Sequence, residues 1–165
     1  MKVLSDSSPL ITLAKIGRLD LLPQLYETVT ITPEVYAEVV VSGAGMPGSS
    51  QISAAKWIHV RPVQKPANLA AAQQRFGLGI GELSVIMLGH ELQADVLLVD
   101  DMKARNLAQE EGMAVLRCVG VLHDAFGLKL VSDLPGAYRQ LLASGAYVDR
   151  VLLENILKIL NLPPL

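Results

Sequence analysis

Short apolar runs alternate with segments of helical periodicity along most of this chain. Residues 2–5 form an apolar run that stops at Asp6, after which apolar positions recur at helical spacing as far as Gly17. Residues 28–32 form a second run, rich in β-branched side chains, and Pro33 opens another helix behind it. The pattern therefore predicts strands that are joined by helices.

The same order returns in the second half of the chain. A glycine-rich turn leads into a predicted helix over residues 82–93, and the apolar run 96–99 ends at Asp100 and Asp101. A helix over 102–111 and a short strand over 114–117 follow, while 57–60 is a minor strand and 67–76 an alanine-rich helix. Three or four short apolar strands separated by helices predict an α/β fold, with a short parallel sheet covered on both faces.

The remaining segments predict loops and helices outside this sheet. Residues 42–50 (SGAGMPGSS) have the composition of a mobile surface loop, which makes them the best place for a substrate-gating segment. From about residue 121 to residue 165 the chain is predicted to be helical, over 121–126, 134–144 and 149–160. The last of these helices carries an apolar stripe, and we expect it to pack on the sheet or on a second subunit.

Length and composition favour one domain, residues 1–165, that associates with another chain. Hydrophobic residues make up 51% of the sequence and charged residues 18%, so some apolar surface is expected to be covered in a homo-oligomer. No apolar run is long enough to span a bilayer, and Asp6 stands where a signal peptide needs an apolar core. We therefore expect a cytoplasmic protein without a membrane partner.

Charge and cysteine content limit the available chemistry. The net charge is -2 and aromatic residues are 4%, so any contact with nucleic acid must be local and cannot use an extensive stacking platform. The single cysteine, Cys118, cannot form an internal disulfide and is predicted to be a buried apolar residue. His59, His90 and His123 form no close pair in the sequence that would favour zinc.

Acidic residues follow the predicted strands or begin the helices behind them. Since ligands of parallel α/β folds bind beyond the carboxyl ends of the strands, these residues could aim their carboxylates at one place. Crowded carboxylates repel one another unless a cation neutralises them, and a hard ion such as Mg²⁺ or Mn²⁺ prefers oxygen ligands. The acids in question are Asp6, Glu38, Glu82, Asp100 and Asp101.

Each acid also has an ordinary structural explanation. Asp6 could simply end a strand, and Asp100 or Asp101 could cap the following helix. Glu82 could be a favourable charge in a first helical turn, and Glu38 could belong to a solvated pair with Glu34. Coincidence at all of these positions is less plausible than at any one, because the predicted fold brings their segments to one edge.

The chain resembles the PIN domain family, and within it the bacterial and archaeal VapC-like branch of toxin-type ribonucleases. The resemblance covers most of the chain, and its first and last motifs are fairly specific in combination. The motifs are VLSDSSPLI from Val3, ITPEVYAEV from Ile31, GIGEL from Gly79, and LLVDD from Leu97 with Ala104 and Arg105 behind it.

The resemblance implies a three-layer α/β/α fold and a divalent-metal-dependent endoribonuclease. Single-stranded RNA would be the substrate and an antitoxin protein a partner. Catalysis and metal binding would fall to Asp6, Glu38, Glu82 and Asp101. The family often has threonine, serine or asparagine where this chain has Asp100, so Asp100 is a further candidate ligand, and we favour Asp101. Among substrate contacts, Ser7 matches the family's small hydroxyl after the first aspartate.

Basic residues beyond the acidic pair add to this set. Lys103 and Arg105 could hold a phosphate of the cleaved strand, although a solvated helix face would look the same.

Three alternatives remain beside this interpretation. A PIN-like module with an incomplete site could bind nucleic acid or protein without cleaving. A receiver domain has a similar acidic strand end, but its acidic pair follows the first strand, whereas here it comes late. The third alternative is a protein that binds a nucleotide cofactor, but the glycines at 77, 79 and 81 lack the spacing of a dinucleotide or phosphate-binding loop.

Overall fold

The computed structural model describes residues 1–165 and contains one parallel sheet. Its five strands stand in the order β3-β2-β1-β4-β5, and every neighbouring pair is parallel. The prediction of a short parallel sheet is confirmed, with more strands than the three or four expected. The strands are β1 (Val3–Ser5), β2 (Val29–Ile31), β3 (Ile58–Val60), β4 (Val96–Leu98) and β5 (Val115–Leu116).

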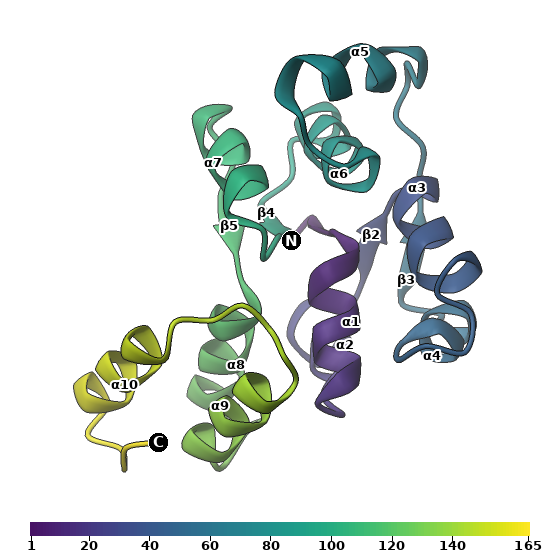
Figure 1. The fold of residues 1–165 in the computed structure, drawn as a ribbon. Helices are drawn as coiled ribbons and strands as arrows, with labels where there is room; N and C mark the ends of the chain where they lie inside the picture. Colours follow the sequence, from purple (N-terminus) through teal and green to yellow (C-terminus); the bar gives the residue numbers. More distant parts are fainter.

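Helices cover the sheet in two groups, as Figure 1 shows. The helices α1 and α2 pack with α8, while α6 packs with α3, α5 and α7. The fold is thus a three-layer α/β/α arrangement, as predicted. The helices are α1 (Ser7–Lys15), α2 (Leu21–Tyr26), α3 (Pro33–Tyr36), the π-helical turn η1 (Ala37–Val41), α4 (Ser49–Ala54), α5 (Ala67–Phe76), α6 (Ile80–Leu92), α7 (Met102–Glu110), α8 (Cys118–Gly127), α9 (Leu134–Ala143) and α10 (Arg150–Ile159).

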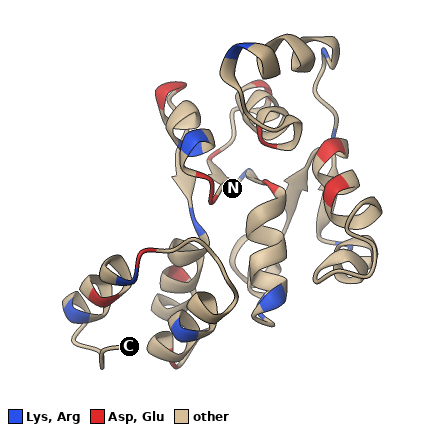
Figure 2. Ribbon diagram, in the orientation of Figure 1, with Lys and Arg blue, Asp and Glu red and all other residues tan.

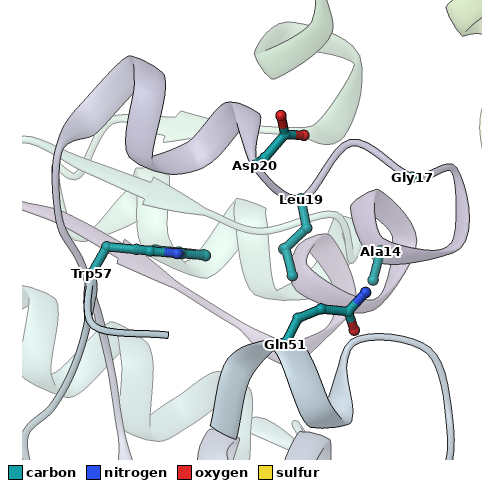
Figure 3. Close-up of a pocket in the computed structure, with 6 residues that line it drawn as sticks. All are labelled: Ala14, Gly17, Leu19, Asp20, Gln51 and Trp57. Atoms are coloured by element: carbon teal, nitrogen blue, oxygen red, sulfur yellow. The ribbon is translucent and has the colours of Figure 1, made fainter. Parts of the chain in front are cut away.

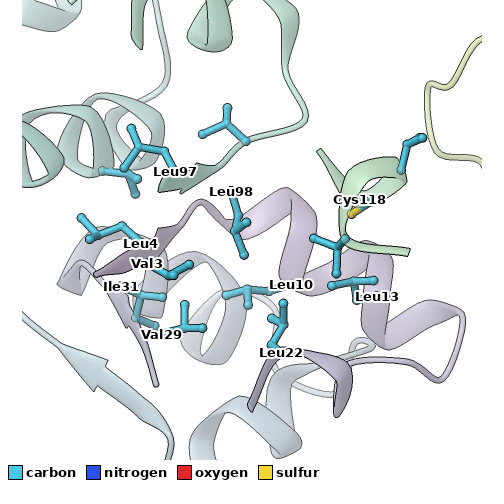
Figure 4. Close-up of a cluster of buried hydrophobic side chains, with 14 of the residues drawn as sticks. Val3, Leu4, Leu10, Leu13, Leu22, Val29, Ile31, Leu97, Leu98 and Cys118 are labelled. Carbon is cyan, nitrogen blue, oxygen red and sulfur yellow. The ribbon is translucent and has the colours of Figure 1, made fainter. Parts of the chain in front are cut away.

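Apolar side chains from strands and helices meet in one cluster of 36 buried residues. All of β1 is buried, as expected for a central strand with helices on both faces. Figure 4 shows strand residues such as Leu4 and Ile31 beside Leu10 and Leu13 of α1. This packing fixes where β1 ends, and therefore where Asp6 lies.

The C-terminal helices begin at Cys118, slightly earlier than the predicted start near 121. The last helix, α10, contacts α9 and buries Leu153 and Leu157. Other apolar residues of the same helix stay in contact with solvent, with Val151 65% and Ile159 79% exposed. No helix combines the length and the apolar content that crossing a bilayer requires.

Two features around residues 37–54 were not predicted. The helix that Pro33 opens continues as the π-helical turn η1, and the short helix α4 follows the glycine-rich segment. Helix α4 has only six residues and begins with two serines, so its sequence lacks a periodic apolar pattern. The π-helical turn carries Glu38, one of the predicted site residues.

Candidate active site

The register of the two central strands brings Asp6 close to Asp100. Ser5 of β1 is paired with Leu98 of β4, and the Asp6 backbone N–H donates to the Leu98 carbonyl oxygen over 3.0 Å. Asp6 directly follows β1, and Asp100 is the second residue after β4. Both therefore lie at the carboxyl edge of the sheet.

Asp6 is a buried carboxyl group among other acids. Its residue is 2% exposed, and no lysine or arginine forms an ion pair with it. Its pKa is raised to about 7, chiefly by burial and also by Glu82, Glu38 and Asp100, while a hydrogen bond from the Ser7 backbone partly offsets the rise. The surroundings of Asp6 therefore disfavour its ionised form.

Glu38 reaches the same place from η1. Its Oε2 accepts a hydrogen bond from Ser7 Oγ over 2.6 Å, whereas the 3.5 Å from Ser7 Oγ to Asp6 Oδ1 is too long for more than a weak contact. On its other side the Glu38 carboxyl lies against Gly81, where an added Cβ would collide with it. Ser7 and Gly81 together hold this carboxylate beside Asp6.

Glu82 is fixed by the first turn of α6. Its Oε2 accepts from the Gly79 backbone N–H over 2.9 Å, which is the return half of a capping box. Partial burial raises the pKa of Glu82, the hydrogen bond from Gly79 counteracts this, and Asp101 and Glu38 raise the pKa again. The first-turn position expected as the alternative explanation is present, and the same carboxyl group also lies close enough to Asp101 and Glu38 for them to act on its pKa.

A buried chain of hydroxyl groups joins the helices that carry Glu38 and Glu82. The Val35 N–H donates to Thr32 Oγ1, and Thr32 Oγ1 lies 2.6 Å from Ser84 Oγ. Ser84 Oγ in turn donates to the Gly81 carbonyl oxygen over 2.6 Å. Thr32 and Ser84 are both fully buried, so this chain sets the spacing between α3 and α6. Neither residue was predicted from the sequence.

Asp100 and Asp101 have different partners. Asp100 Oδ1 accepts from the Cys118 backbone N–H over 2.9 Å, and its Oδ2 from Cys118 Sγ over 3.0 Å. Asp101 is exposed and caps α7 by accepting from the Ala104 N–H over 2.8 Å. Asp100 acts on the pKa of Asp6 and Asp101 on that of Glu82. Cys118 is buried as predicted, and it also orients Asp100.

A cavity of about 620 Å³ opens beside these acids. Glu82, Asp100 and Asp101 line it, whereas Asp6 and Glu38 are not among its lining residues. Figure 2 shows acidic segments gathered where β4 ends and α1 and α6 begin. Three predicted acids thus share one cavity, and the other two adjoin it.

Of the two predicted basic contacts, only Arg105 lines the cavity. Lys103 is exposed, and its Nζ donates to the Gly77 carbonyl oxygen over 3.2 Å. Arg105 is half-buried and lines the cavity together with Arg117, which the sequence analysis did not identify. Arg117 directly follows β5, so a search of every strand end for basic residues would have found it.

The donor set fits a hard divalent ion that keeps much of its water. All the clustered groups are carboxylates, and the buried Asp6 has no cationic partner. No three acidic, histidine or cysteine side chains stand close enough to form a complete ligand set on their own. Magnesium is typically bound through one or two carboxylates, with water and substrate phosphates filling its other positions. The arrangement therefore suits Mg²⁺ or Mn²⁺ better than zinc.

A second hollow lies at the opposite edge of the sheet. It has a volume of about 270 Å³ and is lined by residues such as Asp20, Gln51 and Trp57 (Figure 3). Trp57 stands just before β3, which places the hollow at the amino ends of the strands. A single carboxylate there, Asp20, offers no cluster for a metal ion.

Comparison with known families agrees with this architecture. No curated protein matched the chain significantly. A family model for the PIN domain, in contrast, matches residues 2–162. PIN domains have a nuclease-type fold and are generally nucleases. Because the match spans nearly the whole chain, whose parallel sheet agrees with that fold, the protein belongs to the PIN domain family.

Proposed function

We propose that the protein is a divalent-metal-dependent endoribonuclease that hydrolyses RNA phosphodiesters. The observation that carries this proposal is the buried Asp6 carboxyl, which lies among Glu38, Glu82 and Asp100 with no ion-pair partner. Holding like charges together costs stability, so an arrangement of this kind is expected where a cation is bound during function.

Each acid has a defined task in this proposal. Asp6, Glu38, Glu82 and Asp101 would hold Mg²⁺ or Mn²⁺, with Asp100 as a further ligand or as the group that orients the site. The ion, when bound, supplies activation of water and neutralisation of the phosphate charge. The chain's own contribution is positional: Ser7 orients Glu38, Gly79 orients Glu82, and Cys118 orients Asp100.

The decisive experiment is a nuclease assay on purified protein with a single-stranded RNA. Cleavage should require Mg²⁺ or Mn²⁺, stop in chelator, and be lost in Asp6→Asn. Glu110→Gln, which removes an exposed acid far along α7, is the matched control and should cleave normally. Cleavage by Asp6→Asn at the wild-type rate in saturating metal would assign the activity to other residues or to a contaminant.

We further propose that the protein is the toxin of a toxin–antitoxin pair and that it forms homo-oligomers. The support is the exposed apolar surface of α10, including Val151 and Ile159. Light scattering at micromolar concentration should give more than the monomer mass, and Ile159→Glu should reduce it. A wild-type monomer would remove the argument for self-association.

The alternative function is a PIN-like module that binds nucleic acid or protein without cleaving it. The observation in its favour is that no three acidic side chains form a complete ligand set on their own. Calorimetric titration with Mn²⁺ separates the two proposals. A nuclease should bind Mn²⁺ and lose this binding in Asp6→Asn, whereas a non-catalytic module should show no such Asp6-dependent binding.

A further inference from the structure

Two arginines share the cavity with the acids. Arg117 follows β5, which pairs with β4, so it lies at the same sheet edge as Asp100. Arg105 projects from α7, one helical turn after Asp101. Both line the cavity beside Glu82 and the acidic pair. Positive charge is therefore concentrated next to the acids, although the chain as a whole carries a net charge of -2.

Neither guanidinium group has all of its donors satisfied within the protein, although Arg117 Nη2 donates to the Tyr147 carbonyl oxygen. The ion pairs of the structure involve other residues, so Arg105 and Arg117 form none, even with the acids nearby. The Nε atoms of both arginines are buried and lack a hydrogen-bond partner. Burial lowers the pKa of Arg105 and the nearby Arg117 lowers it further, while Asp100 and Asp101 raise it, as expected for a guanidinium group that lies close to both a cation and the acidic pair. Two adjacent cations with free donors are a receptor for an anion.

An exposed aromatic ring stands at the rim of the same cavity. Tyr147, in the segment between α9 and α10, is 99% exposed, the highest value of any large apolar residue here. Arg117 Nη2 donates to the Tyr147 carbonyl oxygen over 3.1 Å, so this segment is tied to the end of β5. Figure 1 shows the segment passing the start of α8. The Tyr147 ring itself is left free to contact a ligand.

We propose that Arg105, Arg117 and Tyr147 form a nucleotide subsite that binds a phosphate and the adjacent base of a single-stranded nucleic acid. The proposal extends the nuclease function above and rests on it for the strand to be cleaved. A nucleotide unit offers one anionic group and one planar ring, which are the two chemistries that this part of the cavity can bind. The subsite leads the strand from Tyr147 towards the acids.

An unpaired strand fits this subsite better than a duplex. In a duplex the bases are already stacked on one another, and a tyrosine at a cavity rim cannot reach their faces. The proposal therefore separates the two contributions: the arginines should give affinity that depends on salt, and Tyr147 should give affinity that depends on the presence of a base.

The test is binding of a fluorescein-labelled oligouridylate, measured by anisotropy in the uncleaving Asp6→Asn background and in chelator. Arg105→Gln and Arg117→Gln should each weaken binding about tenfold and lower the slope of log affinity against log salt by about 0.7. Tyr147→Ala should weaken binding about tenfold without changing that slope, while Tyr147→Phe binds normally. Arg139→Gln, an exposed arginine on α9, is the matched control.

An oligonucleotide with abasic positions isolates the role of the ring. With this oligonucleotide, Tyr147→Ala should bind as tightly as the protein that keeps Tyr147, because no base is left to stack on the ring. Equal affinity of all variants for the oligouridylate would overturn the proposal, as would the absence of binding. Since Tyr147 is fully exposed, Tyr147→Ala is expected to fold, so a misfolded arginine variant does not remove the test.

Together with the nuclease assay on the wild-type protein, this binding experiment distinguishes the subsite from the proposed nuclease activity. Binding that depends on the arginines and on Tyr147, in a protein that never cleaves RNA, would support the subsite and refute the hydrolase. Metal-dependent cleavage with binding that is indifferent to these residues would do the opposite.

Discussion

Asp6→Asn is expected to make the metal-free protein more stable at neutral and alkaline pH. The carboxyl group is 2% exposed, and its pKa in the folded chain is about 7 against 3.8 in the unfolded reference. Each step of one in pKa corresponds to about 1.4 kcal/mol, so this difference amounts to about 4 kcal/mol as an upper limit. Asparagine has nearly the same shape and carries no charge at any pH.

The sign follows from which state holds the proton more tightly. The folded pKa of Asp6 is raised, so its contribution is fully present below pH 3.8 and is lost as the pH rises to about 7. The Asp6→Asn variant does not lose stability in this way, because asparagine does not ionise. The difference in unfolding free energy, variant minus wild type, should therefore grow by up to about 4 kcal/mol between acid and alkaline solution.

Urea unfolding in chelator, at several pH values between about 4 and 8, measures this difference. Glu110→Gln is the control, and its stability should run parallel to that of the wild type. Adding Mg²⁺ or Mn²⁺ at about a hundred times the dissociation constant should return about 2.7 kcal/mol to the wild type only. Parallel pH profiles for wild type and Asp6→Asn would refute the burial of an unpaired carboxyl at this position.

Three other substitutions test how the site is held together. Gly81→Ala should displace the Glu38 carboxyl and reduce metal-dependent cleavage by about tenfold or more with little change in melting temperature, whereas Gly127→Ala, at an open position, should cleave normally. Thr32→Val breaks the buried hydroxyl chain and should lower the unfolding free energy by about 1–3 kcal/mol in urea unfolding, a cost that a neutral result would disprove. Asp101→Asn should abolish cleavage without lowering stability, since asparagine caps a helix as well as aspartate does; full activity would transfer the role to its neighbour.

The elements with a strong local signal were predicted well from the sequence. The helix over 67–76 and the strand at 96–99 agree with α5 and β4 because an alanine-rich segment and a buried apolar run specify their own structure. The π-helical turn has no such signal. Its residue Glu38 contacts Ser7 on one side and lies against Gly81 on the other, so these contacts join three segments that are separate in the sequence.

The site divides in the same way. The gathering of the acids at one edge could be predicted because they stand at strand ends or helix starts, and the carboxyl ends of neighbouring parallel strands lie at the same edge of a sheet. The preference for Asp101 over Asp100 came from the family resemblance alone, since the sequence does not show that Cys118 donates to Asp100 while Asp101 caps α7. The subsite residue Tyr147 lies in a loop with no periodic pattern, and only its contact with Arg117 connects it to the cavity.

The cost of the acidic cluster explains why the positioning contacts are buried. Domains are usually stable by only about 5–15 kcal/mol, so an ionised Asp6 that costs up to about 4 kcal/mol takes a large share of the total. Most of this cost comes from burying the charge, and the neighbouring carboxylates add a repulsion that would push them apart if their segments could move. The Thr32–Ser84 contact prevents this by fixing α3 against α6 inside the protein, where hydrogen bonds do not compete with water. A protein that loses this contact relieves the repulsion by moving Glu38 away from Asp6, and it should bind metal more weakly for that reason.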